Sequence, residues 1–342
     1  MHRLLFLASL TACSVPAVAE PVRSTASANV DLGKGPQMGV NLSGCEFVDN
    51  GALCPSAASV NTYIDKGFTV LRIPFKGKQA SDPVVVRKLQ LIAQTAAARG
   101  AYVILDRHDY GPAFRPEQLP FWTALMANFP DSTHVLVDPM NEPKSGYTYE
   151  KDAATGKSFG TEVNAAIVGF RKAGFKHTLV IEWKEWAGMQ RFDKGETATA
   201  ICRSPACSLD RAGGLKDPIG RTLLSGHRYP DSNGSGTSAK CVADKTGPQL
   251  VANAEKGAAA RNIKLWVGEF AFGSYAGVSA TCETIGRGLI ARMRAMPQVY
   301  AGVSWWGGGN GWKENYFYKV EPKKGTFATA APSKYLTIIT GK

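Results

Sequence analysis

Short apolar runs recur along this chain, with more polar segments between them. Each run is rich in Val, Ile, Leu and aromatic residues. Short continuous runs of this kind are typical of parallel strands that are buried on both faces. There are eight of them: Met38–Leu42, Phe68–Ile73, Tyr102–Leu105, Val135–Val137, Thr178–Ile181, Thr222–Leu224, Leu265–Val267 and Val299–Trp305.

Helix-like segments separate most of these runs. The clearest helix is predicted over Pro83–Gly100, where Val85, Leu89, Ile92 and Ala96 share one face and a glycine ends the pattern. Further helices are predicted over Glu162–Gly174, Pro248–Asn262 and Thr281–Met296. Strand and helix that alternate eight times predict an α/β fold, a closed (β/α)8 TIM barrel in a single domain.

The alternative fold is a doubly wound open sheet. It requires a Gly-rich phosphate turn after the first strand, and Asn41-Leu42-Ser43-Gly44 is not one. The glycines of 307–311 follow the last run and do not open a helix, so they do not support a nucleotide site. P-loop, G-x-S-x-G and H-E-x-x-H motifs are absent from the sequence. The barrel is therefore the better interpretation.

The N-terminus has the features of an export signal. A basic start, the apolar or small residues 4–18 and the motif Ala17-Val18-Ala19 predict a signal peptide over residues 1–19. The alternative is a lipobox at Leu10-Thr11-Ala12-Cys13, which would anchor the chain through a lipidated Cys13. Residues 20–36 are rich in Ser, Ala and Gly and are predicted to be a flexible leader before a domain over 37–342.

The rest of the composition fits an exported soluble protein. No second apolar stretch is long enough for a transmembrane segment, so we expect a secreted or periplasmic chain. The net charge of +12 is compatible with a solvated surface or with an anionic partner. The basic residues are scattered without a recognition motif, which argues against nucleic acid. We expect a monomer.

Six cysteines remain beyond the signal segment. An even number in an exported chain predicts disulfides, and local spacing favours Cys45–Cys54, Cys202–Cys207 and Cys241–Cys282. A zinc site is the weaker alternative, because the sequence contains no CxxC pair or close Cys/His cluster.

Candidate chemistry gathers where the predicted strands end, which is the face on which barrels of this kind build their sites. Glu142 follows the fourth run and Glu269 follows the seventh. Cleavage of a glycosidic bond requires at least two carboxyl groups of this kind. The other strand ends contribute Arg72, His108, Asn141, Trp183, Trp186, His227, Tyr229, Trp305 and Trp306.

These motifs resemble glycoside hydrolase family 5, the cellulase and mannanase family. Asn141-Glu142-Pro143, His227-Arg228-Tyr229, Glu269 and a late Trp follow its order, and the resemblance covers nearly the whole mature chain. The stretch His227–Cys241, which includes residues 231–237, looks like the loop of the fungal-type endoglucanase subfamily. The resemblance implies a retaining endo-β-1,4-glucanase with a polysaccharide substrate and without a metal or organic cofactor.

The resemblance also implies roles for the site residues. Glu142 would be the acid/base, with a pKa raised by a neighbouring negative charge, and Glu269 the nucleophile, held ionised by Arg72 and Tyr229. Asn141 would donate to the sugar 2-hydroxyl, and the two carboxyls would lie about 5–5.5 Å apart.

The remaining side chains are expected to bind or to pack. His108 and His227 would bind sugar hydroxyls or the acid/base, Trp306 would support the cleaved sugar, and Trp186 would serve a neighbouring subsite. Trp305 and Trp306 alternate on one strand, so only one of them should face the site. Trp183, His134 and His177 are interpreted as structural, while Glu182 and Glu185 are rival carboxylates that match no catalytic position of the family.

Several cations depart from the usual cellulase pattern. They are Lys76, Lys78, Lys144, Lys184 and Arg228, and Asp109 stands where an Asn is usual. A ring of cations could attract an acidic or decorated glucan, although solvated loop lysines are the simpler interpretation. A β-mannanase or a hydrolase of a bacterial exopolysaccharide is therefore one alternative function. A polysaccharide-binding barrel without catalytic activity is the other.

Overall fold

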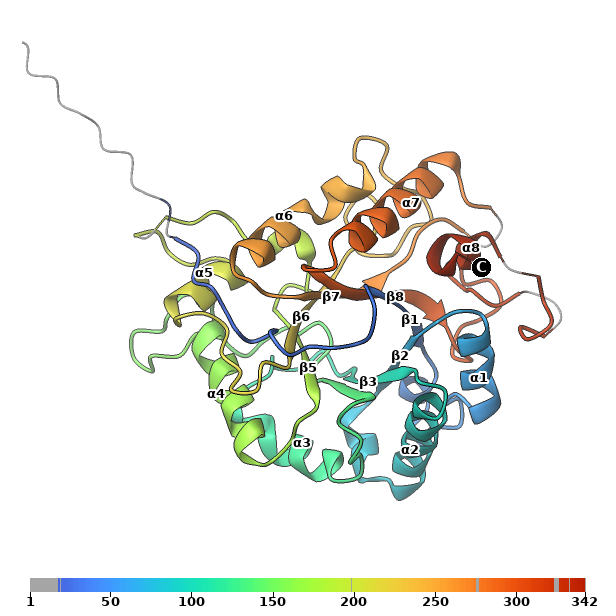
Figure 1. Ribbon diagram of the computed structural model, residues 1–342, viewed down its shortest axis with the longest axis horizontal. Coiled ribbons are helices and arrows are strands. Elements are labelled where there is room, and N and C mark those ends of the chain that lie inside the picture. The colour runs from blue at the N-terminus through green and yellow to red at the C-terminus, as the bar shows by residue number, and fades with distance from the viewer. Residues whose placement is uncertain are drawn as a thin grey trace, which may run out of the picture.

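The protein is a closed barrel of eight parallel strands. The computed structural model describes residues 18, 20–197, 199–274, 277–322, 326–331 and 333–341. The strands follow one another around the barrel in chain order, and the last pairs with the first (Figure 1). They are β1 (Gln37–Leu42), β2 (Val70–Phe75), β3 (Tyr102–Arg107), β4 (Val135–Asp138), β5 (Thr178–Glu182), β6 (Thr222–His227), β7 (Leu265–Phe270) and β8 (Tyr300–Gly308). All eight predicted strands and the predicted fold class are confirmed.

Helices lie around the outside of the barrel (Figure 1). They are α1 (Ala57–Asp65), α2 (Pro83–Ala97), α3 (Leu119–Met126), α4 (Phe159–Lys172), α5 (Pro205–Arg211), α6 (Gly247–Ala260), α7 (Ala280–Ala295) and α8 (Lys334–Thr340). Short 3-10 helices span Cys45–Phe47, Gly77–Ser81, Pro116–Gln118 and Met189–Arg191. The four predicted helices are confirmed. At the start of α2, the Asp82 side chain accepts a hydrogen bond from the Val84 N–H, and Pro83 occupies the first turn.

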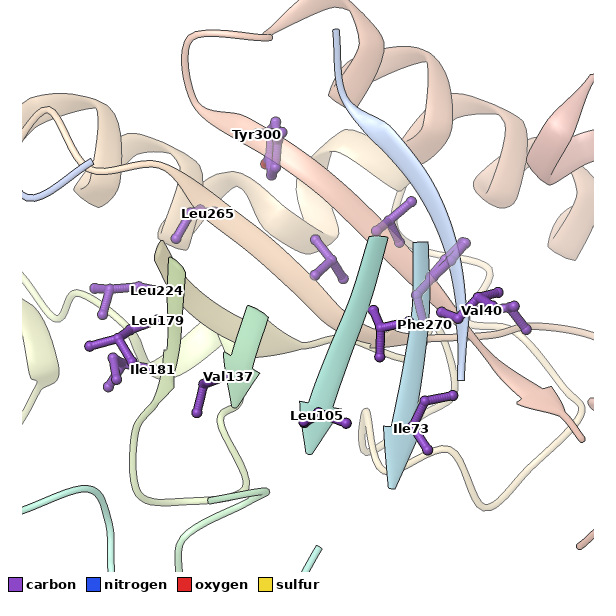
Figure 2. Packing of buried hydrophobic residues seen from close by; sticks show 14 of the residues in the cluster. Val40, Ile73, Leu105, Val137, Leu179, Ile181, Leu224, Leu265, Phe270 and Tyr300 are labelled. Carbon is purple, nitrogen blue, oxygen red and sulfur yellow. The ribbon is translucent and has the colours of Figure 1, made fainter. Parts of the chain in front are cut away.

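Alternation along each strand separates the apolar core into two clusters. Ile73, Leu105 and Val137 belong to the larger cluster, which also contains the buried faces of the helices (Figure 2). Their neighbours in the chain point the other way, because successive strand side chains lie on opposite faces. A second, smaller cluster contains one such residue from each strand from β2 to β8: Val70, Ile104, Leu136, Val180, Leu223, Trp266 and Ala301.

The barrel interior changes character along its length. Two residues beyond the apolar Val70 stands Arg72, and Asp106, Asp138 and Glu182 are related in the same way to Ile104, Leu136 and Val180. Residues two apart on a strand share a face. The interior is therefore apolar toward the start of the strands and charged toward their C-terminal ends.

The segment before β1 is not the flexible leader that its composition predicted. Thr222 N–H donates to the Ala26 carbonyl at 2.8 Å, and the Ser27 hydroxyl donates to the Thr222 carbonyl at 2.6 Å. Val30 and Leu32 are buried in the smaller apolar cluster. Small residues hid this role in the sequence, because many of the contacts are made by the hydroxyls of Ser24 and Ser27 and by backbone groups rather than by large apolar side chains. The segment over residues 24–32 is thus part of the fold.

The predicted signal peptide over residues 1–19, with Cys13, lies outside the described residues apart from Val18. None of the helices in the described ranges has the length and apolar character needed to cross a bilayer. The predicted disulfide pairing is confirmed: Cys45–Cys54, Cys202–Cys207 and Cys241–Cys282 are bonded.

Candidate active site

Glu142 and Glu269 lie side by side at the C-terminal end of the barrel. Glu142 Oε1 is 3.0 Å from His227 Nδ1, and Glu269 Oε2 is 3.6 Å from the same nitrogen. One atom of each of the three side chains lies within 4.8 Å of the others. Two carboxyls this close match the separation used in retaining glycoside hydrolysis, whereas inversion needs room for a water between them.

The backbone at Glu142 adopts an unusual conformation. Its φ is 42°, in the left-handed region that side chains other than glycine rarely occupy. The Glu142 N–H donates to Glu182 Oε2 at 2.7 Å, and the preceding Asn141 N–H donates to the Arg107 carbonyl at 3.0 Å. These two bonds hold the strained turn just beyond β4 and aim the Glu142 side chain at His227.

The surroundings of Glu142 favour its protonated form. Burial raises the pKa of Glu142, and the negative charge of Glu269 raises it further, although His227 acts to lower it. A carboxyl that is protonated at neutral pH can donate a proton, so these surroundings suit a general acid.

Glu269, within β7, faces donors instead. The Tyr229 hydroxyl donates to Glu269 Oε2 at 2.6 Å, and Arg72 Nη1 lies 3.4 Å from Glu269 Oε1. Hydrogen bonds from a hydroxyl and a guanidinium stabilise the charged form of a carboxylate. The side chain is only 7% exposed, so little water competes for its oxygens.

Arg72 is the fully buried centre of the site. Its guanidinium donates to Asn141 Oδ1 at 2.8 Å and to Asn41 Oδ1 at 2.9 Å. Burial alone would lower the pKa of Arg72, but the surrounding carboxylates raise it well above its usual value. Because the side-chain oxygen of Asn141 accepts a hydrogen bond from Arg72, the NH2 group of Asn141 is the part available to a sugar hydroxyl. The carboxylates that face the guanidinium are Asp106, Asp138, Glu182 and Glu269.

His108 and Trp306 form a second wall of the site. The two rings stack with centroids 5.6 Å apart and an angle of 13° between their planes. His108 Nδ1 bonds Asp106 Oδ2 at 2.8 Å, and Nε2 bonds the Tyr110 hydroxyl at 2.9 Å. Trp305 is fully buried and packs on the other face of the strand, against Phe272 and Tyr335 among others. Trp306 is therefore the tryptophan on the site's side of β8. The alternation predicted that only one of the two would face the site, and the family resemblance favoured Trp306.

Trp186 lies in the loop just beyond β5. It is 58% exposed and, with Glu142, His227 and Tyr229, it lines a cavity of about 420 Å³. Three consecutive residues here, Glu185 to Ala187, have positive φ, which turns the chain sharply at the mouth of the cavity. Trp183 is fully buried, as expected for a packing residue.

The histidines that were interpreted as structural lie away from this site. His134 bonds Asp131 just before β4, and His177 Nε2 bonds the Phe129 carbonyl just before β5. Of the rival carboxylates, Glu185 pairs with Arg191 near the surface. The other, Glu182, is buried beside Arg72 and contacts its guanidinium.

Motif matching missed four residues that contribute to the site: Glu182, Asp106, Asp138 and Tyr110. The sequence does contain a signal for the three carboxylates. Each is an inward-facing charged residue at the last or penultimate position of its strand, on β3, β4 or β5. A buried acid at the end of an otherwise apolar strand needs a partner, and the buried Arg72 on β2 provides one.

The cations that the sequence analysis identified lie in different environments. Arg228 is buried and donates to the Leu250 carbonyl, so its assignment to the rim of the mouth was wrong. Lys78 forms an exposed ion pair with Asp49. Lys76 and Lys144 lie over the Tyr110 ring, with Nζ 5.4 and 4.8 Å from its centroid. Lys184 is partly exposed.

Asp109, which stands where an Asn was expected, has a structural role. Its carboxylate accepts from Arg107 Nε at 2.7 Å and from the Gly77 N–H, which ties the loops after β2 and β3 together. Among the described residues, the group with metal-ligating atoms close enough to share an ion is Glu142, His227 and Glu269. Any ion bound there would occupy the reaction centre itself.

An eight-stranded barrel with this pair of carboxylates at its strand ends has the design of a retaining glycoside hydrolase. The cellulase family, glycosyl hydrolase family 5, matches residues 33–310. The chain belongs to this family, as its motifs predicted, and it is an enzyme of the glycoside hydrolase class.

Relatives within the family include fungal proteins, in agreement with the resemblance of the loop over His227–Cys241. Endoglucanase gh5-1 of Neurospora crassa is 27% identical over 86% of this chain and 75% of its own length. Probable endo-beta-1,4-glucanase B of Aspergillus oryzae is also 27% identical, over 85% of this chain and 87% of its own length.

Solved structures share the fold. The endo-beta-1,4-glucanase Xac0029 from Xanthomonas axonopodis pv. citri has a TM-score of 0.74 at 23% identity, over 90% of this chain and 98% of its own. A structure of XacCel5A in complex with cellopentaose has a TM-score of 0.75 at 24% identity, over 91% and 99%. At these identities the likeness establishes the barrel alone.

Proposed function

We propose that this protein is an endo-β-1,4-glucanase that cleaves internal bonds with retention of configuration by double displacement. The observation that carries the proposal is the pair Glu142 and Glu269, both within reach of His227 and within 4.8 Å of each other. Family relatives named as endoglucanases, and a fold neighbour in complex with cellopentaose, support a β-1,4-glucan as the substrate.

In the first step, Glu269 attacks the anomeric carbon while Glu142 gives its proton to the departing glycosidic oxygen. The C–O bond to the leaving sugar breaks, and a covalent glycosyl ester forms on Glu269. In the second step, the Glu142 carboxylate takes a proton from water, and the resulting hydroxyl oxygen bonds to the same carbon as the ester breaks. Two inversions give net retention.

Other side chains bind and orient the sugar in this proposal. The NH2 group of Asn141 donates to the 2-hydroxyl, a bond that strengthens as positive charge develops on the ring. Trp306 supports the cleaved sugar through its flat face. His108 is held through Nδ1 by Asp106, and its Nε2 would bind a sugar hydroxyl in place of the Tyr110 hydroxyl that it bonds at 2.9 Å. Trp186 binds the sugar on the leaving-group side, next to Glu142.

The direct test follows cellopentaose hydrolysis by proton NMR. The β-anomer should appear first, and Glu269→Gln should lower kcat by more than about a thousandfold while cellopentaose binding persists. Glu185→Gln, a nearby glutamate with no proposed role, is the matched control. An α-anomer as first product, or activity retained in the Glu269 variant, would overturn the assignment. Persistent binding without any turnover by the unaltered protein would favour the alternative of a non-catalytic binding barrel.

We also propose that residues 1–19 are a signal peptide and that residues 37–342 form the catalytic domain, preceded by the packed segment over residues 24–32. The mature enzyme would then be secreted or periplasmic. N-terminal sequencing of the protein recovered outside the cytoplasm tests this directly. A start near residue 20 is expected, and a lipid-blocked Cys13 would establish the lipoprotein alternative.

A second candidate is a hydrolase of an acidic or decorated glucan, such as a bacterial exopolysaccharide. Lys76 and Lys144 both lie near Tyr110, and in the described ranges neither forms an ion pair with a carboxylate. Unpaired cations beside a cleft raise the local concentration of an anionic substrate. Two measurements separate the candidates. The first is the rate of hydrolysis on a panel of β-glucans, mannan and exopolysaccharides. The second compares the rates on carboxylated and neutral glucans across ionic strength. Equal rates without salt dependence would eliminate this one.

A further inference from the structure

Glu182, the last residue of β5, bonds three parts of the reaction centre at once. Its Oε2 accepts from the Glu142 N–H at 2.7 Å. Its Oε1 lies 2.9 Å from His227 Nε2 and 3.1 Å from Arg72 Nη2. The side chain is fully buried. A carboxylate offers acceptors on both oxygens, and here both are used.

The first bond acts on the position of Glu142. A φ of 42° is strained in a residue other than glycine and persists only where neighbours hold it. The N–H of Glu142 would otherwise be a buried donor without a partner, so Glu182 both satisfies this donor and fixes the turn.

The second bond acts through His227. The imidazole has Glu182 on Nε2 and Glu142 Oε1, 3.0 Å away, on Nδ1. A carboxylate on one ring nitrogen fixes the proton there and orients the ring, which determines what the other nitrogen presents. His227 is therefore a bridge of fixed orientation between Glu182 and Glu142.

We propose that Glu182 is a positioning residue for the reaction, which sets both the backbone of Glu142 and the protonation of the imidazole that contacts the Glu142 carboxyl. The inference rests on the proposed function, since it concerns the same acid/base. Glu182 does not touch the substrate in this role and acts only through Glu142 and His227.

The charges around the bridge support this role. Burial would raise the pKa of Glu182, but His227, Arg72 and the Glu142 N–H together lower it to about 2, so Glu182 is an anion. Burial would lower the pKa of His227, but Glu182 and Glu269 raise it well above its usual value, so the ring is a cation. The titratable groups that interact with Glu142 include His227, Glu182, Glu269, Tyr110 and Tyr229. Those that interact with Glu182 include Arg72, His227 and Asp138.

The sign of the effect on pH dependence follows from these positions. Without the anion at 182, His227 holds its proton less tightly and becomes neutral at a lower pH. Glu142 then loses a cation that is bonded directly to its carboxyl. This loss outweighs the loss of the anion bonded to its backbone N–H, because His227 has the larger influence of the two on the pKa of Glu142. The pKa of Glu142 rises, and Glu142 becomes a weaker acid.

The test compares Glu182→Gln with Glu182→Asp. In Glu182→Gln, kcat/KM for cellopentaose should fall by about 10- to 100-fold, as for the loss of other outer partners of a functional histidine. The alkaline limb of its pH profile should move up by about one unit. Glu182→Asp keeps the anion, so its limb should stay in place. Glu255→Gln, which removes a glutamate bonded to the half-exposed Arg292 and to Tyr300 away from the site, is the control for losing a paired carboxylate.

A second readout is independent of how much enzyme folds. A dinitrophenyl β-cellobioside has a leaving group that needs little protonation, so its kcat/KM should fall less than about threefold in Glu182→Gln. The ratio of the two rates cancels the active fraction. Equal losses on both substrates, or a limb that does not rise, would overturn the inference. Failure of the unaltered enzyme to cleave either substrate would instead count against the proposed function.

Discussion

Arg72 is a single guanidinium that balances several buried acids. Asp106, Asp138, Glu182 and Glu269 all have an oxygen within 3.4 Å of its terminal nitrogens. One positive charge and the His227 cation do not neutralise four carboxylates. Burial and the charge of Glu182 accordingly raise the pKa of Asp138 well above its usual value, which favours its protonated form.

Removal of Arg72 should therefore damage stability as well as activity. We expect Arg72→Met to lower the free energy of unfolding by about 3–5 kcal/mol, because it leaves buried charges without a partner. Arg99→Met, which removes an exposed pair with Asp65, should change it by less than about 1 kcal/mol. Urea denaturation of both variants measures the difference, and similar losses in the two would contradict the role given to Arg72.

The pH profile tests the protonation of Glu142. The acid must hold its proton in the free enzyme, and burial together with Glu269 raises the pKa of Glu142 above its usual 4.5. Activity should therefore persist above pH 4.5, and kcat/KM should decline as the pH rises through the shifted value.

This limb should belong to Glu142 itself. In Glu142→Ala, assayed on a dinitrophenyl β-cellobioside that needs no acid, the alkaline decline should disappear while the acidic limb remains. An alkaline limb that persists unchanged in this variant would assign the titration to another group.

At the scale of strands, the sequence predicted the architecture better than the site. Apolar runs marked each strand, but β3, β5 and β6 continue past the last apolar residue to Arg107, Glu182 and His227. Backbone pairing does not need an apolar side chain, so the pattern ends before the strand does. The strands therefore carry the charged ends that build the site.

Motifs located the groups expected to contact the substrate but not their supports. Glu142 and His227 could be placed from their neighbours in the chain, because the family order fixes them. Glu182 bonds both, yet it is 40 residues from one and 45 from the other along the chain. Such a contact depends on how strand ends meet in space, which no local pattern encodes.

The disulfides join elements over very different lengths of chain. Cys241–Cys282 ties the loop after β6 to α7 across 41 residues, whereas Cys202–Cys207 spans only 5. In the chain-entropy account, replacing the long bridge with serines should cost about 4 kcal/mol and the short one about 2 kcal/mol. Thermal unfolding of the two double variants compares them, and an equal or reversed order would show that loop length does not govern their contributions.

In the molecule as a whole, the two ends of the barrel interior have different roles. One end of the barrel interior holds Arg72 and the acids that face it, and the other holds the smaller apolar cluster. The charged end cannot be optimised for stability, because its groups must keep the protonation states that the reaction needs. The apolar end has no such constraint, and Val30 and Leu32 of the segment before β1 add to it.

This division leads to a prediction for truncation. A chain that starts at residue 37 would lose Val30 and Leu32 from the apolar cluster and the bonds of Ala26 and Ser27 with Thr222. Loss of two buried aliphatic side chains should lower the free energy of unfolding by about 3–6 kcal/mol. The site lies at the far end of the strands, so kcat and KM of the folded fraction should stay within about twofold of the full-length values.

The matched control is a chain that starts at residue 20, which keeps every one of these contacts. Its unfolding temperature should equal that of the full chain, whereas the start at residue 37 should lower it by at least several degrees. Equal unfolding temperatures for the two truncated chains would mean that residues 20–36 do not contribute to the fold, as their composition alone suggested. A change in KM on truncation would instead indicate that the two ends of the barrel are coupled.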